Sequence, residues 1–223
     1  MKKLIVLFLT GTIFACTGEG HAAPMSQSDI DQLLEKLRGV HDSKPSLVAN
    51  FREERHVAML REPVVNEGRV WLTIPDKIKR EIQGQNPSTT VINGKNMFIY
   101  YPKFKQVEEY DLEKRPMVRD SIQALTAGLD FRRVTDFYQV EASKETDGYQ
   151  ITLTPKTAQV KRLIKSARIK IGPDLSPEAA TVELTKGGTV SVSYTNVRRE
   201  ALPPATFEFS PPPGSTVSTP LGS

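Results

Sequence analysis

Short strand patterns follow one another along most of this chain, and they constrain its fold more than any other feature. About eleven segments of alternating or β-branched residues recur at intervals of roughly 8–14 residues, with turn signals between them. Such short connections form hairpins, and hairpins make a sheet antiparallel. The sequence therefore predicts a mainly β domain and excludes an alternating βαβ fold with a parallel sheet.

The Asn93-Gly94 pair marks the clearest hairpin, because it separates two segments rich in β-branched and aromatic residues. Further turns are expected at Glu67-Gly68, Asp147-Gly148 and Gly187-Gly188. The two isoleucines within residues 78–82 are spaced for either a helical turn or one face of a strand. The other strands are predicted at residues 47–59, 69–74, 90–92, 95–101, 105–112, 137–142, 149–154, 163–171, 181–185, 189–197 and 207–209.

Two stretches have helical spacing instead. One begins after Ser26 and is expected to stop at Gly39, and the other covers residues 119–129. Their apolar stripes consist of Ile30, Leu33, Leu34 and Leu37 in the first helix and of Ile122, Leu125 and Leu129 in the second. A large antiparallel sheet must curl and cover its concave apolar face. The two helices are the available cover, and stripes this narrow suit a lid over a cavity as well as a solid core.

The beginning of the chain has the pattern of a secretory signal. A basic start is followed by an apolar run over residues 4–15 that is too short to span a bilayer, and small residues favour a cut before Ala23. Residues 1–22 are therefore predicted to be a signal peptide, residues 23–214 one domain, and residues 215–223 a mobile tail after the proline-rich stretch. Removing Lys2, Lys3 and Glu19 with the signal leaves a charge of 28 − 25 = +3.

Cys16 allows a second interpretation of this segment. It ends a lipobox-like sequence, although Phe14 is bulky where a small residue is usual, and lipid modification of Cys16 would anchor the chain to a membrane. With an ordinary signal, Cys16 is lost on cleavage and the mature chain has no cysteine left for a disulfide.

Residue patterns for catalysis or metal binding are lacking in the sequence. No nucleophile motif, phosphate-binding loop or zinc-protease motif occurs, and the three histidines His21, His41 and His56 are too few for a His-rich metal cluster. We expect His41 in a loop and His56 on a charged strand, each either solvated or at the edge of the sheet. The basic residues are scattered, which argues against nucleic acid but suits a weakly basic rim near anionic membranes or acidic partners. The sequence therefore predicts no enzyme, cofactor, metal or nucleic-acid partner, with an unrecognised hydrolase as a remaining alternative.

Five segments in order resemble a known family. Residues 47–51 are similar to its first strand, residues 68–75 match Gly-x-x-Trp-x-x-x-Pro, and residues 91–102 match its hairpin. Residues 149–156 match a strand ending in Leu-Thr-Pro-Lys, and residues 207–214 match Phe-x-Phe-x-Pro-Pro-x-Gly. From about residue 28 to residue 214 the chain thus resembles the periplasmic outer-membrane lipoprotein carrier LolA and its relatives.

The resemblance implies an incomplete antiparallel β-barrel whose apolar cavity lies beneath a helical lid. It also implies a periplasmic monomer that takes lipoprotein acyl chains from an inner-membrane releasing transporter to an outer-membrane acceptor. The expected cavity wall consists of Val70, Trp71, Leu72, Ile74, Ile78, Ile82, Ile92, Met97 and Ile99. The expected lid consists of Leu33, Leu34, Leu37, Met117, Val118, Ile122, Leu125 and Leu129. About half of the wall residues face outward, and the alternation does not show which half.

One position departs from the family. Where the lipoprotein carriers have an arginine that bonds to the lid, just before the proline that matches Pro75, this chain has Ile74. Arg80 is a candidate replacement for that latch. The departure leaves three alternatives open, namely a carrier with a differently held lid, a carrier of a glycolipid, and a non-transporting envelope sensor or interaction module on the same fold.

Overall fold

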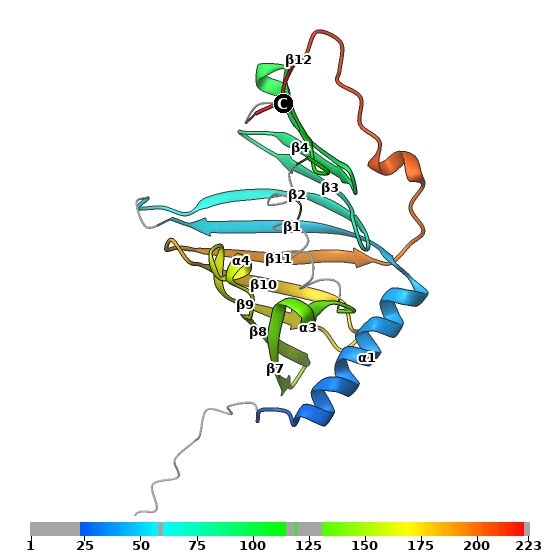
Figure 1. The fold of residues 1–223 in the computed structure, drawn as a ribbon, viewed down its shortest axis with the longest axis vertical. Helices are drawn as coiled ribbons and strands as arrows, with labels where there is room; N and C mark the ends of the chain where they lie inside the picture. Colours follow the sequence, from blue (N-terminus) through cyan, green and yellow to red (C-terminus); the bar gives the residue numbers. More distant parts are fainter. Residues whose placement is uncertain (1–22, 58–59, 115–118, 120–130, 221–223) are drawn as a thin grey trace, which may run out of the picture.

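The strands pair into one sheet in the computed structural model, which describes residues 23–57, 60–114, 119 and 131–220 (Figure 1). The order across the sheet is β12-β6-β5-β4-β3-β2-β1-β11-β10-β9-β8-β7. Their bounds are β1 (Ser46–His56), β2 (Val64–Thr73), β3 (Lys77–Gln83), β4 (Ser88–Asn93), β5 (Asn96–Tyr101), β6 (Gln106–Asp111), β7 (Tyr138–Glu145), β8 (Gly148–Pro155), β9 (Ile164–Ile171), β10 (Pro177–Leu184), β11 (Thr189–Arg198) and β12 (Thr216–Ser218).

The sheet is antiparallel between all neighbours except β12 and β6, which run parallel. Pairing of β1 with β11 joins the early strands to the late ones. Strands β7 and β12 are the two edges, so the sheet curls without closing. This confirms the predicted incomplete antiparallel barrel, with twelve strands rather than about eleven.

The cross-strand register divides the side chains into two faces, because directly opposite residues point to the same side of a sheet. Leu47 lies opposite Leu72, which lies opposite Ile78. We call the face that carries these three residues the inner face, and the other side the outer face. On β9 and β8 the register places Ile169 and Ile151 opposite one another in the core that α1 covers.

Helix α1 (Gln27–Ser43) covers one end of the inner face (Figure 1). The Ser26 hydroxyl accepts a hydrogen bond from the Asp29 amide and caps the helix at its N-terminus. The helix runs through Gly39, where the sequence predicted its end, and so includes His41 in its last turn. Its buried leucines pack with strands β7 to β9 in the main core, which also contains Val140, Ile151, Leu153, Ile169 and Ile171.

Three other short helical segments before residue 200 were not predicted, because one turn of helix has too few residues to show a period. They are α3 (Val134–Phe137), α4 (Ala158–Lys161) and the 3₁₀ turn η1 (Pro102–Phe104). The predicted helix over residues 119–129 lies almost wholly outside the described residues. Within the parts of the chain that are described, no helix is both long and apolar enough to cross a bilayer.

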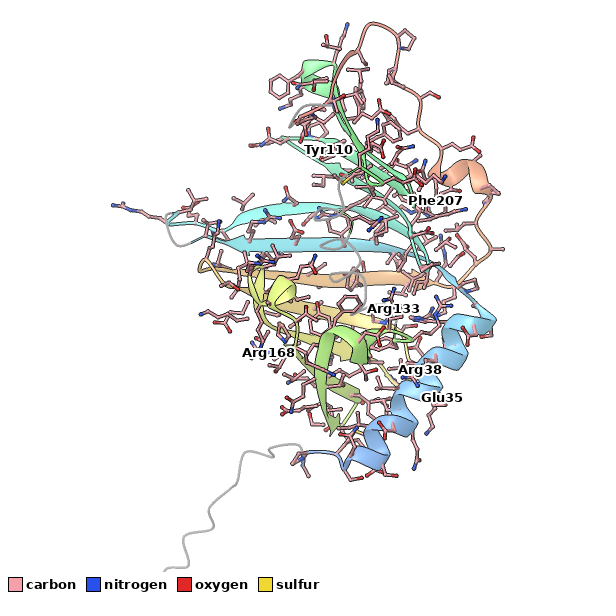
Figure 2. All side chains as sticks on the ribbon, viewed as in Figure 1. Glu35, Arg38, Tyr110, Arg133, Arg168 and Phe207 are labelled. Atoms are coloured by element: carbon pink, nitrogen blue, oxygen red, sulfur yellow. The ribbon has the colours of Figure 1, made fainter. Side chains whose placement is uncertain are left out.

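The C-terminal segment covers the outer face of β3 to β5. The predicted strand at residues 207–209 is wrong, since Pro204–Phe207 form the 3₁₀ turn η2 and the residues after it stay outside the ladder. The prolines on both sides have no N–H for ladder bonds. Phe207 is buried on this segment (Figure 2), and the Phe209 ring lies 5.3 Å from that of Phe98 on β5.

Two further predictions differ from the structure. Glu67-Gly68 lies inside β2 and is no turn, and a Cβ on Gly68 would lie 1.8 Å from the Glu81 carbonyl oxygen of β3. The glycine therefore permits a close approach of backbones rather than a reversal. Residues 216–218 were expected in a mobile tail, but they form β12 against β6. Alternation is too weak a signal in three residues to predict a strand.

Candidate functional site

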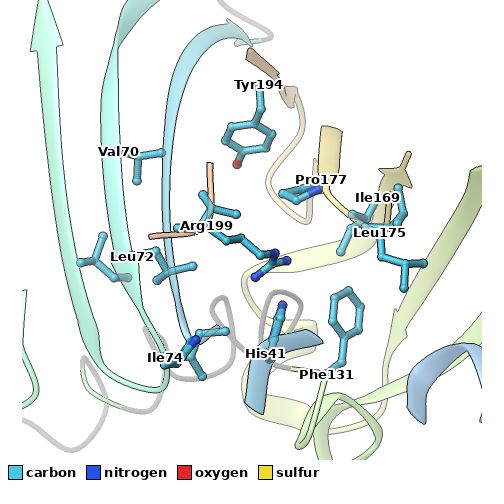
Figure 3. Close-up of a pocket in the computed structure, with 14 residues that line it drawn as sticks. His41, Val70, Leu72, Ile74, Phe131, Ile169, Leu175, Pro177, Tyr194 and Arg199 are labelled. Atoms are coloured by element: carbon cyan, nitrogen blue, oxygen red, sulfur yellow. The ribbon is translucent and has the colours of Figure 1, made fainter. Parts of the chain in front are cut away.

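An apolar pocket opens on the inner face, where the curl of the sheet brings its early and late strands toward each other (Figure 3). One wall comes from β1 to β3, through Leu47, Val70, Leu72 and Ile78, with Ile74 just after β2. Alternation along β2 explains why Val70 and Leu72 line the pocket, because residues 70 and 72 point to one side of the sheet and residues 71 and 73 to the other.

The opposite wall comes from the late strands. It consists of Ile169 and Ile171 of β9, Leu175, Pro177 at the start of β10, and Tyr194 of β11. Ile169 and Ile171 also belong to the main core, so this wall is fixed by the packing that holds α1 on the sheet. The pocket therefore lies between the part of the inner face that α1 covers, over β7 to β9, and the part formed by β2 to β6.

The end of α1 closes the pocket along a third side. His41 is buried there, and its ring centroid lies 5.6 Å from that of Phe131. Arg38 donates from Nε to the Phe131 carbonyl oxygen at 3.0 Å and pairs with Glu35 at 3.2 Å (Figure 2). Arg38 thus links Phe131, which lines the pocket, to Glu35 on the exposed side of α1. The expectation of a solvated His41 in a loop is wrong, because the helix continues beyond Gly39.

The pocket has a volume of about 80 Å³ and a mainly apolar lining. This is room for several waters by the usual measure of one to every 10–15 Å³ or so. A long acyl chain requires more space, so the pocket must widen to receive one.

The predicted wall residues separate into three groups. Val70, Leu72, Ile74 and Ile78 line the pocket. Ile92 and Met97 continue the row of Leu72 and Ile78 across β4 and β5, and Ile82 and Ile99 lie on the same inner face. Trp71 points to the outer face, where the guanidinium carbon of Arg69 and the Lys79 ammonium lie 4.9 and 5.1 Å from its ring centroid. Four of these eight inner-face residues thus lie outside the pocket as described.

The predicted lid residues fall into two sets. Leu33, Leu34 and Leu37 are at most 3% exposed and pack in the main core rather than lining the pocket. A helix that covers β7 to β9 buries its leucines against those strands, which leaves only its last turn to reach the pocket. Met117, Val118, Ile122, Leu125 and Leu129 lie outside the described residues.

A charged cluster lies beside the pocket on the inner face. Glu53 of β1 is 6% exposed and accepts hydrogen bonds from Arg80 at 2.8 Å and from Asn66 at 3.1 Å. The Arg80 guanidinium also stacks over the Phe51 ring, with its carbon 4.3 Å from the ring centroid. The candidate latch Arg80 is therefore held by Glu53, its partner among the described residues.

Two residues that the sequence did not point to, Tyr194 and Arg199, line the pocket from β11 and from the position directly after it. Burial raises the pKa of the Tyr194 phenol, while Arg80 acts to lower it and Glu53 to raise it. Burial also lowers the pKa of the Arg199 guanidinium, and the charge of Asp174 acts in the opposite direction. Nothing in the strand pattern marked these two, because the facing wall is far away in the sequence.

Among the described residues, no group of three or more His, Cys, Asp or Glu side chains is arranged to hold a metal ion. The site that the structure presents is thus a hollow for an apolar ligand, bordered by Arg199 and by the Glu53–Arg80 pair.

Comparisons with known proteins agree with this geometry. The profile of the family described as outer membrane lipoprotein carrier protein LolA matches residues 43–210, about three quarters of the chain. A protein named outer-membrane lipoprotein carrier protein from Edwardsiella ictaluri is 26% identical over 97% of both chains. One of the same name from Chromohalobacter salexigens is 23% identical over 82% of this chain and 85% of its own. An uncharacterized conserved protein from Thermus thermophilus has a similar fold, with a TM-score of 0.51, 14% identity, and coverage of 85% of this chain and 99% of its own.

Proposed function

The chain belongs to the LolA family of outer membrane lipoprotein carrier proteins, and from this premise we propose that it carries lipoprotein acyl chains in the inner-face pocket. In this proposal the protein takes its cargo from the inner membrane and delivers it to the outer membrane. The family consists of carriers and not of enzymes, so the chain is not an enzyme.

The apolar pocket within a curled sheet is the observation that carries the proposal. Each methylene transferred from water to such a lining contributes about 0.8 kcal/mol, so an acyl chain needs a shielded path across an aqueous compartment. Val70, Leu72 and Ile78 present aliphatic surface at the pocket, and they stand on strands held by a continuous ladder. A rigid ladder keeps the apolar surface in place while the cargo enters and leaves.

The small volume of the pocket supports reversible loading. At about 80 Å³ the pocket does not hold a full chain as it stands, so entry requires packed side chains around it to move apart. Separating them removes their dispersion attraction, which offsets part of the gain from burying methylenes. A carrier needs this offset, because a fully favourable fit would prevent release.

We also propose that residues 1–22 are a secretory signal and that the mature protein works in the periplasm. Membership of a family of outer membrane lipoprotein carriers supports this location. The inner-membrane donor and the outer-membrane acceptor are then the partners that the transport direction requires.

A release assay tests the proposed function. Spheroplasts that hold an outer-membrane-directed lipoprotein are incubated with the purified mature protein, and the supernatant is analysed for soluble complexes of the two. We expect the wild type to release lipoprotein in a complex. Leu72→Glu places a charge on the pocket wall and should reduce release by at least tenfold or so. Trp71→Glu, one residue away on the outer face, is the matched control and should release normally.

Two results would overturn this function. One is absence of lipoprotein from the supernatant with folded wild-type protein. The other is equal release by the Leu72 and Trp71 variants, which would mean that the inner face takes no part. Stable capture of an envelope protein without any acyl cargo would instead support an interaction module.

A further inference from the structure

Arg199 places a cation inside an otherwise apolar pocket. It follows β11 directly, and in Figure 3 its guanidinium points into the pocket between the labelled Pro177 and His41. The carrier function described above uses only aliphatic and aromatic surface, so this charge has no role in it.

The hydrogen bonds of Arg199 are incomplete. Its Nη1 donates to the Lys44 carbonyl oxygen at 3.4 Å. Its Nε is buried and has no hydrogen-bond partner among the described residues. Nor does any described carboxylate lie within ion-pair distance of it; Asp174 acts on it only at longer range. A buried N–H donor without an acceptor is costly, since it loses its hydrogen bond to water and gains none within the protein.

Arg80, a second arginine on the inner face, differs from Arg199 in having a carboxylate partner. Arg80 borders the pocket beside Val70, its direct cross-strand partner, and Glu53 supplies a carboxylate at 2.8 Å. The fold therefore neutralises one inner-face arginine with its own acid and leaves the other without an acid. Such a difference is expected where an incoming ligand supplies the anion.

We propose, resting on the carrier function above, that Arg199 binds the carboxylate of a long-chain fatty acid whose tail lies along Leu47, Val70, Leu72 and Ile78. Since Nη1 donates to Lys44, the guanidinium edge formed by Nε and Nη2 is the edge left to bind a ligand. Two parallel N–H groups on that edge match the two oxygens of a carboxylate. The carboxylate is compact, and the tail requires the same widening of the pocket of about 80 Å³ as the acyl chain of a lipoprotein does. The pocket thus accepts a free acidic lipid and not only the uncharged acyl chains of a lipoprotein.

Matched single-chain probes test this inference. Binding of laurate, dodecanol and dodecyl phosphate to the full mature protein is measured by calorimetry below their micelle concentrations. The wild type should bind laurate at least about tenfold more tightly than dodecanol, because only laurate completes the Arg199 hydrogen bonds. Arg199→Gln should bring the two affinities within about twofold, and Arg199→Lys, which keeps the charge but loses the fork, should give an intermediate ratio.

Arg198→Gln is the control, because Arg198 is exposed and lies beside Glu200 at 3.7 Å, outside the pocket lining. It should keep the wild-type preference for laurate. The preference should also vanish near pH 3, where a carboxylic acid is protonated, while dodecanol binding stays the same.

The outcomes separate this inference from the carrier function. Equal binding of laurate and dodecanol by the wild type, or a laurate preference that survives in Arg199→Gln, would overturn the Arg199 site and leave the carrier function standing. Tighter, Arg199-dependent binding of dodecyl phosphate would overturn the choice of a carboxylate. If the wild type binds none of the probes, the inference fails, and the lipoprotein release assay decides the carrier function separately.

Discussion

Glu53 is a buried carboxylate on the inner face, beside the apolar pocket. Arg80 and Asn66 together occupy both of its oxygens, at 2.8 and 3.1 Å. Glu53 and Arg80 can both lie beside the apolar pocket because each neutralises the charge of the other.

Replacing Glu53 by Gln tests this role at the scale of one residue. The change leaves Arg80 without its acid on a part-buried surface, so the free energy of unfolding in urea should fall by about 1–3 kcal/mol. Glu67→Gln is the control, because Glu67 is 65% exposed and pairs with Arg52 at the surface, at 3.3 Å. Its change should stay below about 0.5 kcal/mol. Equal effects of the two substitutions would show that burial of Glu53 is energetically unimportant.

Tyr138 makes the stability of the protein dependent on alkaline pH. Burial raises the pKa of its phenol to about 12, against about 10 in the unfolded chain. The folded protein therefore prefers the neutral phenol more strongly than the unfolded chain does. The stability that this preference contributes is complete below about pH 10 and is lost as the pH rises through about 12.

In Tyr138→Phe no phenol can ionise, so stability should decline less between about pH 9 and about pH 11.5 than in the wild type. The expected difference in the two declines is on the order of 1–3 kcal/mol, measured by urea unfolding at both pH values. Identical declines in the two proteins would contradict the assignment of this pKa to a buried group.

At the scale of elements, Gly68 in β2 and Gly39 in α1 have different effects on packing. Gly68 lies in β2, where a Cβ would approach the Glu81 carbonyl oxygen of β3 to 1.8 Å. Gly39 lies exposed in α1, and a Cβ there would have no neighbour within 4 Å. The first glycine is required by strand packing, and the second only weakens a helix.

Alanine substitutions should therefore have opposite signs. Gly68→Ala should lower the free energy of unfolding by at least about 2 kcal/mol, because a backbone oxygen must move. Gly39→Ala should raise it by about 0.5–1 kcal/mol through helix propensity. Thermal and urea unfolding of both variants measure this. A neutral Gly68→Ala would mean that β2 and β3 are not as close as described.

The existence of the hairpins was predictable because turn residues and alternation are local signals, as in the β4–β5 pair around Gly94. The errors arose where one residue type has two uses. Gly68 was interpreted as a turn although it permits close packing, and Phe207 as a strand residue although it packs against the outer face. Local sequence does not distinguish these uses, because tertiary neighbours decide them.

At the scale of the whole molecule, the site depends on contacts that are distant in sequence. Four of the predicted wall residues line the pocket, because they are the apolar residues in and around β2 and β3 that the sequence already marked. The opposite wall, with Ile171 and Tyr194, and the cation Arg199 were not predictable, because only the curl of the sheet brings them across from Leu72. The register was also needed to assign Trp71 to the outer face, since alternation alone does not show which set of residues points outward.

The inner face of the single curled sheet is closed by α1 over β7 to β9 and keeps a hollow beside β1 to β3. The outer face has a separate cover in the C-terminal segment around Phe207 and Phe209. The two faces of the sheet therefore have separate covers, and the pocket lies on the inner face alone.

The most direct test is photo-crosslinking from two adjacent positions of β3. A photoreactive amino acid is placed at Ile78, which lines the pocket, or at Lys79, which contacts Trp71 on the outer face. Each protein is loaded with lipoprotein, irradiated and digested, and the acylated peptide is sought by mass spectrometry. We expect acyl crosslinks from position 78 and none from position 79. Crosslinks from position 79 alone, or equally from both positions, would contradict an acyl-binding hollow on the inner face.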